Sequence, residues 1–185
     1  MTKVACVADR NQSQLVIVDM QTKLSSVMSD HIAAVVRNCA ILLQSAALLE
    51  IPTIFTEQYP KGLGPTVPEL SPYMTGKKAV EKTAFSCCGE AAFTRQLLGD
   101  HKQVILAGME AHICVLQTAL DLLVQGKTVF VLEDAVISRN PENKRNALNR
   151  MREAGVIISN TESLVFEWLG VAEGDTFKKI SQLVR

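Results

Sequence analysis

A cysteine, an aspartate and a lysine, three side chains that could take part in chemistry, each lie near the end of a predicted strand. Cys114 comes after a buried apolar strand (residues 104–107) and a turn (108–113), at the start of a helix predicted to reach Leu123. Backbone N–H groups and the helix dipole favour an anion there, so a thiolate nucleophile suits the position. A small apolar residue filling the strand–helix junction would suit it equally, and free cysteines often take that role. The stretch alone leaves both interpretations open.

Asp19 and Lys82 occupy comparable positions. Asp19 ends the β-branched run 15–18, which is typical of a central parallel strand that is buried on both faces. Lys82 belongs to a short predicted strand within residues 78–86. Asp19 could instead cap the next segment, and a solvated surface charge is the commoner role for a lysine. Ligands of parallel sheets bind outside the carboxyl ends of the strands, so all three side chains are candidates for one site.

The elements that must position these residues alternate between strand and helix. Strands are predicted at residues 15–18, 52–56, 78–86, 104–107, 127–132 and 156–158, and helices at 29–49, 90–98, 114–123, 141–153, 162–169 and 175–184. This alternation indicates an α/β protein with a three-layer α/β/α architecture and a mostly parallel, Rossmann-like sheet of about six strands. The length fits one domain over residues 1–185.

One long segment has neither helical nor strand periodicity. Residues 57–77 hold four of the six prolines, which predicts a semi-rigid lid in which Tyr59 either faces a ligand or lies on the surface. The helix that precedes the second strand is expected to be capped by Ser29 or Asp30 and to bury Cys39. Cys6 is predicted to lie in the core because of its apolar neighbours.

Composition excludes several functions. Nineteen basic residues balance nineteen acidic ones, so the chain provides no net field for nucleic acid or an anionic membrane. The first fourteen residues do not resemble a signal peptide, and no apolar run approaches the ~18 residues of a membrane span, so a cytoplasmic protein is expected. Five cysteines without C-x-x-C spacing predict free thiols. The histidines lack metal-ligand spacing, and His112 should point away from Cys114 on a helix, which makes it an unlikely base.

The ordered motifs resemble a known family, the isochorismatase-like cysteine hydrolases, which include nicotinamidases and N-carbamoylsarcosine amidases. The resemblance rests on Asp19 with Gln21 two positions later, on Glu81-Lys82 ahead of Phe85, and on residues 108–115, GMEAHICV. It covers nearly the whole chain. Residues 56–68 and 118–123 are most similar to the isochorismatase-domain-containing branch.

The resemblance implies a role for each candidate. Cys114 would be the nucleophile, Asp19 the base that takes its proton and returns it to the leaving group, and Lys82 the cation that lowers the thiol pKa. It also implies a cis peptide bond between Met109 and Glu110, with the backbone N–H groups of Glu110 and Cys114 forming an oxyanion hole.

Two departures from the family pattern narrow the expected chemistry. The segment after the second strand, residues 57–60, contains no histidine, whereas nicotinamidases bind a metal there, so neither a metal nor another cofactor is expected. Isochorismatases that cleave vinyl ethers do not need the cysteine, so its presence favours amide, ureido or ester hydrolysis through an acyl-enzyme. The substrate is expected to be a small molecule that contacts Gln21, Tyr59 and Phe85.

Other functions of the same fold stay open. A member that has lost catalysis could act as a binding or scaffolding protein, although all three triad positions are filled here. Vinyl ether hydrolysis ranks below both, and so does ribonuclease activity, since a neutral chain lacks the basic surface that binds a phosphate backbone. Relatives are commonly oligomers, which implies a homo-oligomer, either a dimer or a tetramer.

Overall fold

The protein is a three-layer α/β/α structure built on a parallel six-stranded sheet. The computed structural model describes residues 7–28, 31–74 and 76–185. The strand order is β3-β2-β1-β4-β5-β6, and all neighbouring strands pair in parallel. The strands are β1 (Ser13–Val18), β2 (Thr53–Gln58), β3 (Val80–Lys82), β4 (Gln103–Met109), β5 (Thr128–Ile137) and β6 (Ile157–Ser159). The predicted fold class and the number of strands are confirmed.

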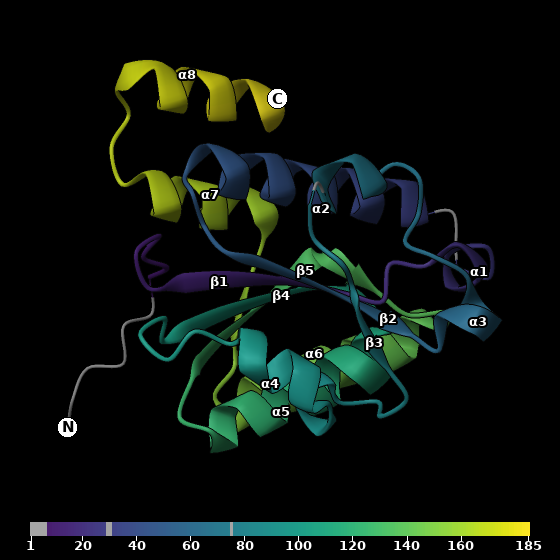
Figure 1. Cartoon of the computed structure of the whole chain (residues 1–185). Coiled ribbons are helices and arrows are strands. Elements are labelled where there is room, and N and C mark those ends of the chain that lie inside the picture. The colour runs from purple at the N-terminus through teal and green to yellow at the C-terminus, as the bar shows by residue number, and fades with distance from the viewer. Residues whose placement is uncertain (1–6, 29–30, 75) are drawn as a thin grey trace.

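Helices cover both faces of the sheet (Figure 1). One face carries α2 (Ile32–Leu48), α7 (Thr161–Leu169) and α8 (Gly174–Leu183), and the other carries α4 (Ala91–Gln96), α5 (Leu116–Val124) and α6 (Pro141–Ala154). Two short helices, α1 (Thr22–Ser25) and α3 (Pro60–Leu63), lie beyond the carboxyl ends of β1 and β2. Each face therefore has its own apolar core, and the carboxyl ends of the strands stay available for a site.

The central strand β1 forms as its sequence predicts. All six of its residues are buried, and it pairs with β2 on one side and β4 on the other. A β-branched run suits a strand that is covered on both faces. Cys39 is fully buried on α2, as predicted, and the four cysteines of the described residues are free thiols. Cys6, Ser29 and Asp30, for which a core position and a helix cap were predicted, lie outside the described residues.

A glycine brings the ends of β1 and β4 close together. Gly108 pairs with Val18 and has a φ of +119°, a conformation that L side chains rarely adopt. A Cβ at this position would lie 2.0 Å from the Val18 carbonyl oxygen. Only glycine permits this approach, which places the turn that holds Cys114 beside the turn that holds Asp19.

The predicted lid contains more regular structure than expected. It begins within β2 and includes α3 and a 3₁₀ turn, Ser71–Met74. Thr66 forms a bridge to Gln21, and the carboxylate of Glu57 accepts hydrogen bonds from both the N–H and the hydroxyl of Thr66, each 2.7 Å long. Single-turn helices carry no periodic pattern, so the absence of helical periodicity in this segment did not exclude them. These contacts tie the lid to β2 and to the segment that follows β1.

Three further boundaries differ from the prediction. The strand expected within residues 78–86 is only Val80–Lys82, and the strand expected to end at residue 132 continues to Ile137 after a register shift against β4. Cys114 does not begin an α-helix but lies in a π-helical turn, Ala111–Val115, that precedes α5. No helix of residues 7–28, 31–74 and 76–185 is long and apolar enough to cross a membrane.

Candidate active site

Asp19, Lys82 and Cys114 come together at the carboxyl ends of β1, β3 and β4. The Lys82 ammonium lies 2.8 Å from Asp19 Oδ2 and 3.4 Å from Cys114 Sγ. The Asp19 and Lys82 side chains are fully buried, and Cys114 is 6% exposed. The three residues predicted from separate strands therefore form one contiguous cluster.

Asp19 is held by the first turn after β1. Its φ of +49° is unusual for a residue with a side chain, and such conformations concentrate at functional sites. The Thr56 hydroxyl donates a 2.7 Å hydrogen bond to Oδ1, and the Asp19 N–H donates to the Thr56 carbonyl oxygen. Oδ2 has the Lys82 ammonium beside it and no hydrogen bond of good geometry. One carboxylate oxygen is thus fixed, and the other faces the cluster.

Lys82 is surrounded by more acceptors than it has protons. An ammonium group has three N–H donors. Five acceptor atoms lie within 3.4 Å of Nζ: Asp19 Oδ2, Gln58 Oε1, the carbonyl oxygens of Ala84 and Phe85, and Cys114 Sγ. Burial alone would lower the pKa of Lys82, but the charges of Asp19 and of a Cys114 thiolate outweigh it and raise that pKa. Lys82 therefore stays protonated and has no donor left for a ligand.

The pKa of the Cys114 thiol is raised, whereas the resemblance implied that Lys82 would lower it. Burial and the negative charge of Asp19 raise this pKa to about 12, and the charge of Lys82 lowers it by less. Lys82 acts in the predicted direction, but the net change is upward. The resting thiol is therefore protonated at neutral pH and needs a base at the moment it reacts.

The turn before Cys114 has the predicted cis peptide bond between Met109 and Glu110. The Glu110 carbonyl oxygen accepts from the N–H groups of Ile113 and Val115. The Glu110 carboxylate binds the backbone N–H and the guanidinium of Arg139. The oxyanion hole expected at the N–H groups of Glu110 and Cys114 stays a prediction.

The three predicted substrate contacts differ in exposure. Tyr59 and Phe85 are each 56% exposed. Gln21 is fully buried, and its side chain bonds to the Gln58 backbone and to the Gly64 carbonyl oxygen, so in this structure it holds the lid and the end of β2. Its placement does not favour direct contact with a substrate.

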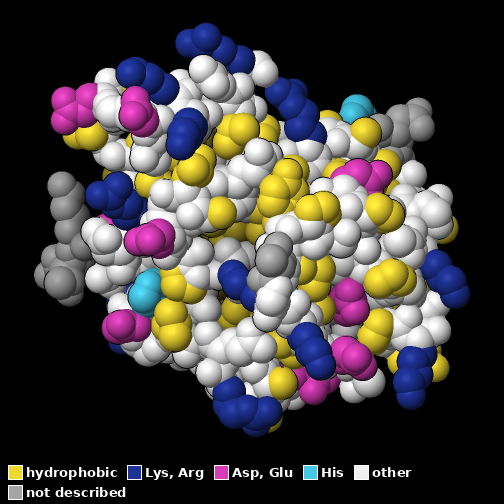
Figure 2. Space-filling model, turned by 45° about the horizontal axis from the view of Figure 1, so that its top comes forward, with side chains coloured by type: hydrophobic (Ala, Val, Ile, Leu, Met, Phe, Trp, Pro, Cys, Tyr) yellow, Lys and Arg dark blue, Asp and Glu magenta, His cyan; other side chains and the backbone are white. Residues whose placement is uncertain are grey.

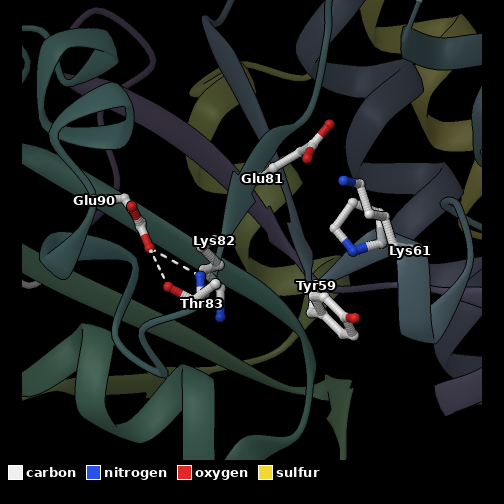
Figure 3. A pocket seen from close by; sticks show the side chains of 7 residues that line it. Tyr59, Lys61, Glu81, Lys82, Thr83 and Glu90 are labelled. Atoms are coloured by element: carbon white, nitrogen blue, oxygen red, sulfur yellow. Dashed lines mark hydrogen bonds between the residues drawn. The ribbon is translucent and has the colours of Figure 1, made fainter.

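A pocket of about 240 Å³ opens beside the outer edge of β3. Its lining includes Tyr59, Lys61, Glu81, Lys82 and Glu90, but not Asp19 or Cys114. Glu81 and Lys82 leave β3 in opposite directions, and Glu90 is hydrogen-bonded to Thr83 on one side, with Tyr59 and Lys61 on the other (Figure 3). The pocket touches the cluster only through Lys82, so we regard it as an approach to the site and not as the site itself.

Two polar residues of β2 complete the cluster, and sequence reasoning missed both. Thr56 binds Asp19, and Gln58 Oε1 lies 2.5 Å from Lys82 Nζ and 4.0 Å from Cys114 Sγ. Their position at the carboxyl end of a parallel strand was the available signal. Glu90, also missed, accepts from the N–H groups of Thr83 and Ala84 and so holds the loop that faces Lys82.

His112 is not a partner of Cys114. Its Nδ1 lies 2.9 Å from the hydroxyl of Ser138, at the end of β5. In the described part of the chain, no three His, Cys, Asp or Glu side chains are grouped so that they could hold a metal ion.

The chain is similar to known proteins over most of its length. The model of the isochorismatase domain matches residues 13–163. Isochorismatase domain-containing protein 2 of Danio rerio is 43% identical over 173 residues, which cover 93% of this chain and 86% of that protein.

Two solved structures share the whole fold. A structure described as the MAR1 ribonuclease of Caenorhabditis elegans has a TM-score of 0.89 and 36% identity, covering 96% of this chain and 92% of that one. The YcaC gene product of Escherichia coli, described as an octameric hydrolase of unknown specificity, has a TM-score of 0.89 and 25% identity, covering 98% of this chain and 92% of that one.

Proposed function

This chain belongs to the isochorismatase domain family, whose members are generally hydrolases, and from that premise we propose that it is a metal-independent cysteine hydrolase of small amide, ureido or ester substrates. The observation that carries the proposal is the contact of Cys114 Sγ with the buried Lys82–Asp19 ion pair. A thiol, a carboxylate and a fixed cation supply the nucleophile, the base and the electrostatic support for acyl transfer.

The reaction would proceed in two halves. Asp19 takes the thiol proton as Sγ attacks the substrate carbonyl carbon, and the carbonyl electron pair moves to oxygen beside the N–H groups of Glu110 and Cys114. The tetrahedral intermediate collapses, the leaving group takes the proton from Asp19, and an acyl-enzyme remains. Water then attacks the acyl carbon, Asp19 accepts a water proton, and the expelled thiolate recovers that proton as the acid leaves.

Lys82 would act without transferring a proton. All of its N–H groups are used by the surrounding acceptors, so it can neither protonate the leaving group nor bind the oxyanion. Its fixed charge balances that of the buried Asp19 carboxylate and stabilises the thiolate as it forms. The mobile proton would therefore pass only between Cys114 and Asp19.

The pH dependence of Cys114 alkylation tests this division of roles. When Asp19 is the base, the reactive state is thiolate plus carboxylic acid, which contains the same number of protons as the resting state. The rate with iodoacetamide, followed by peptide mass spectrometry, should therefore stay flat from about pH 6 to about pH 9. In Asp19→Asn the rate should fall at the acidic end and rise about tenfold per pH unit.

The half-buried Cys88 serves as the internal control, because burial and, to a lesser extent, the charge of Asp121 raise its pKa, and it lies outside the cluster of Asp19, Lys82 and Cys114. Its labelling should rise with pH in both proteins. A Cys114 profile that rises in parallel with that of Cys88 in the wild-type protein would refute Asp19 as the base. Intact-mass screening of a panel of amides and esters then looks for the acyl adduct, which Cys114→Ala must abolish.

A second function comes from the nematode relative, which is described as a ribonuclease. Figure 2 shows acidic and basic side chains interspersed on the face that carries α2 and α8, and the chain has no net charge. Such a surface gives little attraction to a phosphate backbone. Tight RNA binding that weakens steeply with added salt would favour the nuclease. A binding protein without catalysis would show neither RNA binding nor an acyl adduct.

We also propose that the chain forms a homo-oligomer. The support is the octameric Escherichia coli relative. On the face in Figure 2, hydrophobic side chains gather near the centre, and a groove of about 420 Å³ between α2 and α8 is lined in part by Leu48, Tyr73 and Leu183. Light scattering coupled to gel filtration measures the state directly, and a monomer at micromolar concentration would overturn the proposal.

A further inference from the structure

The side-chain amide of Gln58 places a fixed hydrogen-bond acceptor next to the reactive sulfur. Gln58 Oε1 lies 4.0 Å from Cys114 Sγ and 2.5 Å from Lys82 Nζ. The orientation of the amide is dictated by its neighbours: an ammonium can only donate, so oxygen must face Lys82, while Nε2 donates to the Thr83 carbonyl oxygen at 2.9 Å.

The backbone of Gln58 is equally constrained. Its N–H donates to Gln21 Oε1 at 2.7 Å, and its carbonyl oxygen accepts from Gln21 Nε2 at 3.1 Å. Gln21 itself is fully buried. The acceptor therefore stands on a rigid strand end with its side chain bonded at both polar atoms, and a ligand meets it in a set position.

The polar side chains in contact with Sγ offer acceptors and no spare donor. The Lys82 protons are shared among five acceptor atoms, while Asp19 Oδ2 and Gln58 Oε1 present lone pairs. A carbonyl-type oxygen accepts two hydrogen bonds, and Lys82 fills one position on Gln58. The other faces the sulfur, whose own proton leaves when Asp19 takes it.

The leaving-group atom meets this acceptor during the reaction. In the tetrahedral intermediate the leaving atom and Sγ are bonded to the same carbon, so the leaving atom lies beside the groups that contact Sγ. A leaving nitrogen can receive the Asp19 proton on its lone pair while an N–H that it already carries donates to Gln58 Oε1. An alkoxy oxygen receives the proton equally well but has no N–H to donate.

We infer that Gln58 is a specificity-determining residue that selects substrates whose leaving group is a nitrogen bearing N–H, such as a primary amide or ureido group, over alkyl esters. The inference rests on the proposed function and narrows its substrate class. A site that leaves a half-buried acceptor unpaired with the wrong substrate should discriminate by about tenfold, the value of one ordinary hydrogen bond.

Two alkylating reagents test the preference without a known substrate. Iodoacetamide and methyl iodoacetate deliver the same two-carbon unit to sulfur and differ in that one carries NH₂ where the other carries OCH₃. The second-order rate constant for labelling of Cys114 is measured for each reagent. It is divided by the rate constant of the same reagent with glutathione, which corrects for the intrinsic reactivity of the reagent. The wild-type protein should prefer iodoacetamide by about tenfold after this correction.

Two variants test whether Gln58 is the cause of the preference for iodoacetamide. Gln58→Leu removes the acceptor and should bring the corrected ratio close to one, whereas Gln58→Glu keeps an acceptor oxygen and should retain the preference. A general loss of thiol reactivity changes both rates equally and cancels in the ratio. A wild-type ratio near one overturns the inference even if neither variant folds, and so does an unchanged ratio in Gln58→Leu.

Failure of the proposed hydrolase mechanism can be distinguished from failure of the proposed role of Gln58. The flat pH profile of Cys114 labelling reports on Asp19 as the base, and the reagent ratio reports on Gln58. A flat profile with a ratio near one keeps the hydrolase and removes the role of Gln58. A profile that rises with pH removes the hydrolase mechanism whatever the ratio.

Discussion

Replacing Lys82 by methionine should destabilise the protein far more than a typical lysine substitution. Lys82 and Asp19 are both fully buried and 2.8 Å apart, so the variant leaves a carboxylate without its cation in the interior. Breaking a buried ion pair from one side costs about 3–5 kcal/mol. For a chain of this length, 1 kcal/mol shifts the melting temperature by roughly 2–4 °C, which predicts a loss of roughly 6 to 20 °C for Lys82→Met.

Thermal unfolding followed by circular dichroism measures the change, and two variants make it specific. Lys78→Met alters an exposed lysine four positions earlier and should shift stability by no more than about 0.5 kcal/mol. The double variant Asp19→Asn/Lys82→Met removes both charges and should recover much of the loss, because the penalty comes from the unpaired carboxylate. Equal melting temperatures for Lys82→Met and Lys78→Met would refute the reasoning.

Three further variants probe the supports of the site. Gly108→Ala should unfold at a clearly lower temperature or fail to fold because its Cβ meets backbone, whereas Gly99→Ala, with open space around it, should be near neutral; equal effects would contradict the close approach. Thr56→Val should slow Cys114 labelling at neutral pH by removing the hydroxyl that binds Asp19, and Thr56→Ser should restore it; identical rates in both would argue against this role. Hydrogen bonds from two backbone N–H groups lower the pKa of Glu90 from 4.5, so its contribution to stability is present above pH 4.5 and is lost as the pH falls through the lower folded value. The difference in melting temperature between wild type and Glu90→Gln should therefore shrink on acidification, and a constant difference would refute this linkage.

The sequence carried strong signals where local pattern and burial agree. The apolar run of β1, and the Pro141 and Gly155 that bound α6, were sufficient for placing those elements. The π-helical turn at Cys114 was not predictable, since it depends on a bond from the Val115 N–H to the Glu110 carbonyl oxygen that has no sequence signature. β3 stops at Lys82 because the chain then turns, a change that the alternating pattern did not reveal.

The residues of the candidate site also fall into two groups: those that the local sequence predicts and those whose roles depend on distant partners. Asp19, Lys82 and Cys114 were found because each stands at a strand end and is chemically distinctive. Thr56 and Gln58 were missed because their roles depend on partners 37 and 24 residues away, a relation visible only once β2 lies between β1 and β3. From the sequence alone, a polar residue within a strand cannot be distinguished from an ordinary residue of an edge strand or of the surface.

The raised pKa of Cys114 changes how the cluster should be understood. A thiol with a pKa of about 12 is protected at rest, since so little thiolate exists at neutral pH for oxidants or stray electrophiles to find. In the proposed mechanism, the same Asp19 whose charge suppresses the thiolate is the base that removes the proton. Reactivity would then depend on a substrate that occupies the space beside Sγ and offers a carbonyl oxygen to the N–H groups of Glu110 and Cys114. In such a site, binding of the correct substrate would itself activate the nucleophile, because the thiolate forms only when the polar groups of the substrate pair with those of the site.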